Sequence, residues 1–307
     1  MTAVAQRVRT RNRTRLRGFL LALPPVLVIA FFIGLPVIAA IAYTFGYSGG
    51  INSVVAALAQ KQHLVDGAAP TFDAYREVLG DSSFRTDLLV TVIVTIVTVV
   101  LVMVLSWAIA LYARFSRGVL AKLVTALAVV PMFIPVVIAS YAILTFYSTD
   151  GFTRTLFHLL GWEDSPALAY KMTGVTVGQV WTHLPFGVLL ISSGLSSVPD
   201  TLIDAARDAG ASMSRAVRAV MIPMAALPTI IVATFTGIGV LGSFTVPYLI
   251  GPNAPNMLGV SMAQYYQSFN QAQQAVVMAV VVFVLAAGIG YFYVRANAKS
   301  ARGSGRL

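Results

Sequence analysis

The stretch LLVTVIVTIVTVVLVMVLSWAIALY, residues 88–112, is the strongest indication of how this chain folds. It is 25 residues long and contains no formally charged side chain. Its valine, isoleucine and threonine residues would favour a strand in water. The run is too long for a buried strand, however, and it matches the roughly 20 helical residues that cross a bilayer core. Residues 88–112 therefore predict a transmembrane helix.

Five further apolar runs have the same character. They are residues 19–45, 119–147, 172–195, 225–250 and 275–294. None of the six runs contains an acidic residue, and Lys122, near the start of the third, is their one formally charged side chain. Since lipid cannot satisfy backbone hydrogen bonds, each run is expected to be helical. The expected fold is an all-α integral membrane protein with six transmembrane helices.

The overall composition supports this class. Hydrophobic residues make up 58% of the 307 residues and charged residues 10%, whereas a soluble domain carries about 25% charged residues. A large soluble helical core would require polar helix faces, which these runs lack. The chain also contains no cysteine, so disulfides, cysteine metal sites and thiol nucleophiles are excluded.

Basic residues predict the orientation. If the N-terminus is cytoplasmic, the inward segments hold 16 Lys and Arg residues and the outward segments hold 5, as the positive-inside rule requires. Both termini are then cytoplasmic, with basic tails at 1–18 and 295–307 around a transmembrane domain at 19–294. The N-terminal arginines are expected to contact membrane lipid and not nucleic acid. The first run exceeds a signal-peptide core of about 7–15 residues, so it is interpreted as an uncleaved span.

No catalytic motif accompanies the spans. None of the four lysines follows a glycine, so the chain has no phosphate-binding P-loop. His63, His158 and His183 lie in separate segments without metal-ligand spacing. The predicted spans contain no carboxylate pair that could relay protons. The chain therefore offers a path across the membrane without an energy source, and no cofactor or metal is expected on it.

Several side chains in the spans are candidates for that path. His183 is the one histidine within a span, and it is either functional or a neutral imidazole bonded to a neighbouring helix. Aromatic rings could line a path for a cation, or they could simply pack at the interface. The candidate path residues are Tyr141, Trp181, His183 and Phe244.

The inward loop at 196–224 has a distinctive pattern. Asp200, Asp204 and Asp208 are spaced four residues apart, so they share one face of a short helix. A second, less polar face consists of Leu202, Ile203, Ala206 and Ala209. The pattern predicts a short cytoplasmic helix that could contact a soluble partner. The alternative is an amphipathic loop that lies on the membrane.

A proline and a glycine mark the predicted start and end of this short helix. Pro199 suits the first turn of a helix, and Gly210 can adopt the left-handed conformation that ends one. A second short helix is expected after this hinge and is expected to stop at Pro223.

The spacing in this loop resembles one known family. Inner-membrane permease subunits of binding-protein-dependent ABC importers carry Glu-Ala-Ala, three residues, Gly, nine residues and Ile-x-Leu-Pro. The same spacing holds here for Asp204-Ala205-Ala206, Gly210 and Val220-Met221-Ile222-Pro223. The resemblance also covers the six-span layout, from about residue 17 to 295.

The resemblance implies a coupling helix that fits a groove on a cytoplasmic ATPase. The residues implied in this contact are Asp204, Ala205, Ala206, Asp208, Gly210, Ala211, Ser212 and Pro223. It further implies a second permease subunit, two ATP-binding cassette subunits and an extracytoplasmic substrate-binding protein. ATP and magnesium would be bound by the ATPases and not by this chain. The expected location is the bacterial inner or plasma membrane.

The solute is suggested by a finer resemblance. Ala209 precedes Gly210 where the sugar branch of the family usually has an aspartate. The alanine at 209 and the segments 131–135 and 181–186 look like those of the branch that transports polyamines, thiamine, ferric ion and aminophosphonates. Spermidine or putrescine is the expected solute and a sugar is the alternative. A self-contained secondary transporter is a competing class, but it would predict intramembrane charges or an internal repeat.

One outward segment leaves two possibilities open. Residues 251–274 carry no charge and are rich in Asn, Gln, Tyr and Pro. Such a loop can lie on the surface, or it can dip between spans, where amides are tolerated more readily than charges.

Overall fold

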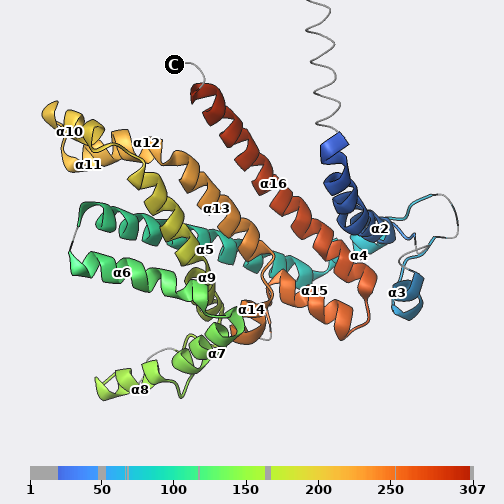
Figure 1. Cartoon of the computed structure of the whole chain (residues 1–307). Helices are drawn as coiled ribbons and strands as arrows, with labels where there is room; N and C mark the ends of the chain where they lie inside the picture. The colour runs from blue at the N-terminus through green and yellow to red at the C-terminus, as the bar shows by residue number, and fades with distance from the viewer. Residues whose placement is uncertain are drawn as a thin grey trace, which may run out of the picture. The chain divides into compact units, whose positions relative to one another are not determined.

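The computed structural model describes residues 20–47, 53–65, 67, 69–116, 118–162, 167–252 and 254–304 (Figure 1). All regular secondary structure within these residues is helical, which confirms the all-α prediction. The basic N-terminal tail predicted at 1–18 lies outside the described residues. In the C-terminal tail, residues 295–304 continue helix α16 (Ala272–Ser304).

Four helices in the described part of the chain are long and apolar enough to cross a membrane. They are Leu20–Thr44, α5 (Ser82–Phe115), α9 (Met172–Ser196) and the portion Ala272–Arg295 of α16. The number rises to six if two bent helix pairs each count as one span. The multi-pass prediction is confirmed, and two of the predicted spans are bent.

The third predicted span is sharply bent. The run 119–147 consists of α6 (Val119–Val129), a 3₁₀ turn and α7 (Val136–Tyr147). The direction changes by 113° between the segment Val119–Phe133 and the segment Val136–Leu159, which also includes α8 (Phe152–Leu159). Pro131 and Pro135 explain the break. Each lacks an N–H for the helix, and Ile134 before Pro135 is extended, with ψ of 124°.

The fifth predicted span is also divided. The run 225–250 contains α13 (Ala226–Leu241) and α14 (Thr245–Ile250), separated by residues 242–244. A second bend of 69° separates α13 from the segment Met213–Met224 that precedes it.

The chain forms two compact units, Met1–Val78 with Tyr265–Val277, and Leu79–Gln264 with Met278–Leu307. In the second unit, α9 packs against α5, α6, α7, α13 and α14. Small residues permit the close approach. A Cβ on Gly194 of α9 would lie only 2.7 Å from Cγ of Pro228 in α13.

The uncharged segment 251–274 does not lie on the surface throughout. Within the second unit, Met257, Leu258 and Val260 are buried. The carboxylate of Asp87 in α5 holds this segment, because it accepts hydrogen bonds from the Asn256 N–H (2.9 Å) and the Ser261 hydroxyl (2.6 Å). The possibility that the segment dips among the helices is therefore confirmed for residues 257–261.

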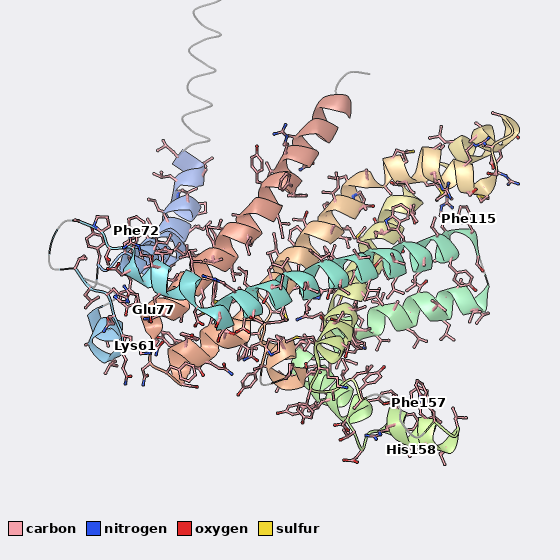
Figure 2. The ribbon with its side chains drawn as sticks, turned by 180° about the vertical axis from the view of Figure 1, so that it is seen from behind. Lys61, Phe72, Glu77, Phe115, Phe157 and His158 are labelled. Atoms are coloured by element: carbon pink, nitrogen blue, oxygen red, sulfur yellow. The ribbon has the colours of Figure 1, made fainter. Side chains whose placement is uncertain are left out.

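In the first unit, amide side chains organise the loops. Gln273 at the start of α16 donates to the carbonyl of Tyr43 (2.9 Å), which lies near the end of the first span. Gln274 donates to the carbonyl of Lys61 (2.7 Å) and to the carboxylate of Glu77 (3.1 Å). Figure 2 labels Lys61 and Glu77 on the segments that these bonds join. This unit contains the short helices α3 (Ser53–Leu58) and, for most of its length, α4 (Asp73–Gly80).

Candidate functional site

The helix predicted in the inward loop is present as α10 (Asp200–Asp208). Pro199 precedes it, and the Asp200 carboxylate lies in its first turn, where negative charge complements the helix dipole. The helix ends at Asp208, and Gly210, two residues further on, has a left-handed φ of 84° as predicted. The N–H groups of Gly210 and Ala211 bond to the carbonyls of Arg207 (2.8 Å) and Ala206 (3.0 Å). This pair of bonds is a Schellman motif.

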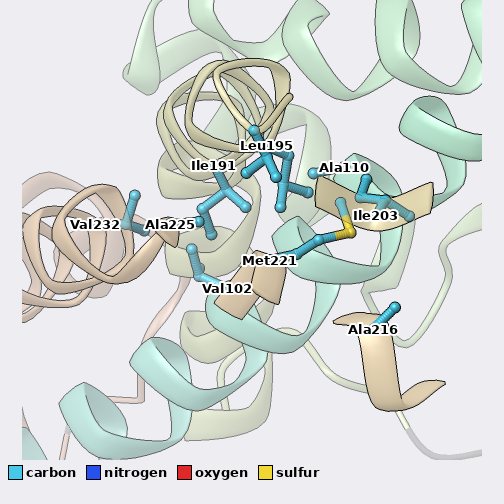
Figure 3. Packing of buried hydrophobic residues seen from close by; sticks show 10 residues of the cluster. Val102, Ala110, Ile191, Leu195, Ile203, Ala216, Met221, Ala225 and Val232 are labelled. Atoms are coloured by element: carbon cyan, nitrogen blue, oxygen red, sulfur yellow. The ribbon is translucent and has the colours of Figure 1, made fainter. Parts of the chain in front are cut away.

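One side of α10 is attached to the transmembrane helices. Ile203 is 5% exposed and belongs to a cluster of buried apolar side chains from α5, α9 and the loop (Figure 3). Ala206 is half-buried and packs against the same cluster. Leu202 and Ala209, in contrast, are exposed. The prediction that four residues share one less polar face is therefore wrong in part. Ile203 and Ala206 lie three residues apart on the buried side of the helix, whereas Leu202 points about 100° away from Ile203.

The three aspartates do not behave alike. Asp200 forms an ion pair with Arg114, at the end of α5. Asp204 and Asp208 are exposed, and the described part of the chain shows no ion pair for either. Ala205 is exposed beside them. The surface of α10 that is open to a partner thus carries two carboxylates and a small side chain.

The segment after the hinge continues further than predicted. It comprises α11 (Met213–Ala216), the π-helical turn Val217–Met221 and α12 (Ile222–Met224). Pro223 does not stop the helix, which ends one residue later. A π turn lies just before Pro223, and its wider spacing accommodates a proline that has no N–H and that crowds the preceding turn.

The remaining residues of the predicted coupling contact lie at the hinge or beyond it. Ala211 is half-buried, whereas Ser212 and Pro223 are exposed. The Ser212 hydroxyl lies 3.2 Å from that of Ser214.

The predicted path residues on α9 face different neighbours. Trp181 lines an apolar pocket of about 340 Å³ between α7 and α9, which also includes Tyr147. His183 bonds through Nδ1 to the carbonyl of Gln179 (2.8 Å), one turn earlier in its own helix. Its Nε2 faces Gly239 of α13, where a Cβ would lie 2.7 Å away. The expected bond from His183 to a neighbouring helix is therefore replaced by close packing.

The two other predicted path residues are more accessible. Phe244, in the break between α13 and α14, stacks on Tyr248 with ring centroids 4.9 Å apart, and the two side chains are 39% and 60% exposed. Tyr141 on α7 is also exposed. Within the described residues, the pocket around Trp181 includes neither Tyr141, His183 nor Phe244. The four candidates do not converge on one pocket.

Two polar contacts were not predicted from the sequence. The buried side chain of Gln179 donates to the Ser243 hydroxyl (2.6 Å) and so ties α9 to the break after α13. A glutamine inside an apolar run is a signal that could have been noticed. The pairing of Arg114 with Asp200 could not have been found from local pattern, because 86 positions separate the two residues.

The bent spans and the exposed helix α10 together define the class of membrane protein. The chain is a multi-pass α-helical membrane protein with bent spans and one exposed, firmly attached helical loop. No cluster of three or more metal-ligating side chains occurs among the residues that the structure describes.

Comparison with known proteins identifies the family. The chain belongs to the family described as the binding-protein-dependent transport system inner membrane component, whose model matches residues 103–303. It is therefore a transport permease subunit and not an enzyme, as its sequence predicted.

Individual relatives agree with this assignment. The trehalose transport system permease protein SugA of Mycobacterium tuberculosis is 28% identical over 98% of this chain and 95% of its own length. The spermidine/putrescine transport system permease protein PotB of Escherichia coli is 28% identical over 61% of this chain and 68% of its own length. A chain in the crystal structure of a bacterial alginate ABC transporter, in complex with an alginate pentasaccharide-bound periplasmic protein, has the same fold. The TM-score is 0.74 at 14% identity, with 94% of this chain and 96% of that chain covered.

Proposed function

We propose that this chain is one of two permease subunits of an ATP-driven importer. A second permease, two cytoplasmic ATPase subunits and an extracytoplasmic binding protein complete the assembly, and the ATPases bind ATP and magnesium. The observation that carries the proposal is α10, whose exposed carboxylates and small side chains lie on a helix anchored to α5 and α9. The family assignment supports it.

The exposed side of α10 has the chemistry of a docking surface. Asp204 and Asp208 can pair with basic side chains of an ATPase, and Ala205 allows a close approach. Ile203 and Ala206 attach the same helix to the transmembrane cluster. Movement of an ATPase would therefore displace α10 together with α5 and α9. Such rigid-body displacement alternates access to the path, and ATP shifts the equilibrium between the two states.

The proposed location is the bacterial inner membrane, with both termini and α10 in the cytoplasm. The excess of basic residues in the segments on the side of α10 supports this orientation. The pairing of Arg114 with Asp200 is consistent with this layout, because it requires the end of α5 and the start of α10 to lie on the same side of the membrane.

The solute is proposed to be a neutral carbohydrate. A trehalose permease aligns with nearly the whole chain, whereas the polyamine permease aligns with 61% of it. The spermidine or putrescine expectation is thus not confirmed. A polycation would also be served best by carboxylates along its path, and the predicted spans contain none.

Two of the predicted path residues are suited to contact such a solute. Phe244 presents an exposed ring that Tyr248 supports by stacking, and Tyr141 is exposed on α7. Aromatic faces pack well against the apolar faces of sugar rings, and the phenol can also hydrogen-bond. Trp181 and His183 are half-buried between helices, so their proposed role is to hold the walls of the path.

Affinity purification of the full-length chain from its native membrane tests the assembly. We expect an ATPase, a second permease and a binding protein to co-purify. Radiolabelled trehalose and spermidine are then offered to the purified complex in vesicles. ATP-dependent uptake of trehalose supports the proposal, uptake of spermidine alone overturns the solute class, and a chain that transports without any ATPase overturns the function.

A further inference from the structure

Among the residues that the structure describes, α10 forms one ion pair, and it lies at the first residue of the helix, Asp200. The guanidinium Nη2 of Arg114 donates to the carbonyl of Val198 (3.2 Å) and pairs with the carboxylate of Asp200. Val198 follows α9 and Asp200 begins α10. One side chain from α5 thus holds the point where α9 passes into α10.

This contact differs from an ordinary surface ion pair. The Arg114 side chain is 21% exposed, while that of Asp200 is 66% exposed. A guanidinium that is largely withdrawn from water and bonded to both a carbonyl and a carboxylate makes stronger contacts than two solvated side chains. Arg114 also lies in the last turn of α5, where the helix dipole favours a positive charge.

The bond between Arg114 and Asp200 restricts the rotation of α10 about its axis, which apolar packing alone does weakly. Ile203 is the one buried residue that α10 contributes to the apolar cluster. Apolar packing is non-directional, so it sets how deeply α10 sits but only weakly sets its rotation. The N-cap residue Pro199 makes no side-chain cap hydrogen bond. The bond from Arg114 to Asp200 is directional, and it therefore fixes the rotation.

Rotation of α10 decides where its exposed carboxylates point. Asp204 and Asp208 follow Asp200 by one and two turns on the same face. Helix α5, which carries Arg114, has 34 residues and is therefore about 50 Å long. Through Arg114, a tilt of α5 would change the direction in which Asp204 and Asp208 point, and a displacement of α10 would in turn act on α5.

We propose that Arg114 is a positioning residue that couples α5 to the orientation of α10 through Asp200. This inference rests on the proposed function, since it needs an ATPase that docks on α10. It assigns to Asp200 a role within the chain that differs from the partner-facing role of Asp204 and Asp208.

The test uses the complete complex in vesicles and measures solute transported per ATP hydrolysed. Arg114→Gln and Asp200→Asn each remove the ion pair with little change in size. We expect each to lower transport per ATP about fivefold, with normal assembly and an unfolding temperature lowered by no more than a few degrees. The double variant should be no worse than either single variant, because both remove the same contact.

Two further variants sharpen the test. Arg114→Lys should keep more coupling than Arg114→Gln, because a single nitrogen of Arg114 makes both bonds. Lys122→Gln removes an exposed positive charge at the start of α6 and should leave coupling unchanged. If Arg114→Gln does not assemble, Asp200→Asn carries the test, since its side chain is mostly solvent-exposed.

The inference is overturned if both single variants couple within twofold of the unmodified complex, or if the losses multiply in the double variant. It is also overturned if transport per ATP falls only as far as the amount of assembled complex. An unmodified complex whose ATPase ignores the binding protein and the solute would instead contradict the proposed function itself.

Discussion

Substitution of Gly194 by alanine tests the close packing of α9 on α13 near the end of α9 that leads into α10. The added Cβ would lie 2.7 Å from Cγ and 3.1 Å from Cβ of Pro228. Ordinary contact between carbon atoms begins near 3.4 Å, so the helices must separate by about 0.7 Å. The proline ring cannot rotate away as a flexible side chain would. Overpacking of this kind costs about 1–3 kcal/mol, against a gain of up to about 1 kcal/mol in helix propensity.

The middle of that cost range, about 2 kcal/mol, less the gain in helix propensity leaves an expected net loss of about 1 kcal/mol, which lowers the unfolding temperature by a few degrees. Intrinsic fluorescence of the three tryptophans reports the transition in detergent. Gly288→Ala in α16 is the matched control, because no atom lies within 4 Å of the added Cβ there. Pro228→Ala removes the clashing ring atom, so Gly194→Ala should be nearly neutral in that background. An equal loss in both backgrounds would refute the reasoning.

Three further predictions follow from the site. Gly210→Val should destabilise the loop by about 1–3 kcal/mol because its φ of 84° strains a β-branched residue, and it should uncouple ATP hydrolysis from uptake; Gly210→Asn, which tolerates this backbone conformation, should retain more coupling. Gln179→Leu leaves the Ser243 hydroxyl without its partner, so the thermal stability should fall by about 1–3 kcal/mol; an unchanged melting curve would contradict the role of that bond. Phe244→Ala should raise the KM for trehalose uptake about fivefold through loss of about 1 kcal/mol of ring contact, whereas an unchanged KM would remove Phe244 from the path.

Local sequence features account for the elements that were predicted well. Apolar length alone located the spans, and Pro199 and Gly210 delimited α10 because a proline and a left-handed glycine act within one turn of the helix. Helix α5 begins at Ser82, six residues before the apolar run, because Asp81 caps it by accepting a bond from the Ser83 N–H (2.8 Å).

Long-range contacts account for what the sequence could not reveal. The prolines at 131 and 135 indicate where the third span breaks, but the local sequence does not give the angle of 113°. The burial of residues 257–261 depends on Asp87, which lies 174 positions before Ser261. The path candidates were selected by residue type. Their directions depend on helix rotation, and Trp181 and His183, two positions apart, point about 200° from each other.

The central claim is that α10 docks on an ATPase in the cytoplasm, and cross-linking from Ala205 tests it most directly. The chain contains no cysteine, so Ala205→Cys introduces a single thiol on the exposed side of α10. We expect a short cross-linker with a maleimide at one end and a succinimidyl ester at the other, added to inside-out vesicles of the native complex, to join this thiol to a lysine amine of an ATPase subunit. Ser83→Cys, at the end of α5 far from its contact with α10, is the control and should give no cross-link to an ATPase. Labelling of Ala205→Cys by a membrane-impermeant maleimide added to intact cells, without any cross-link to an ATPase, would contradict the account.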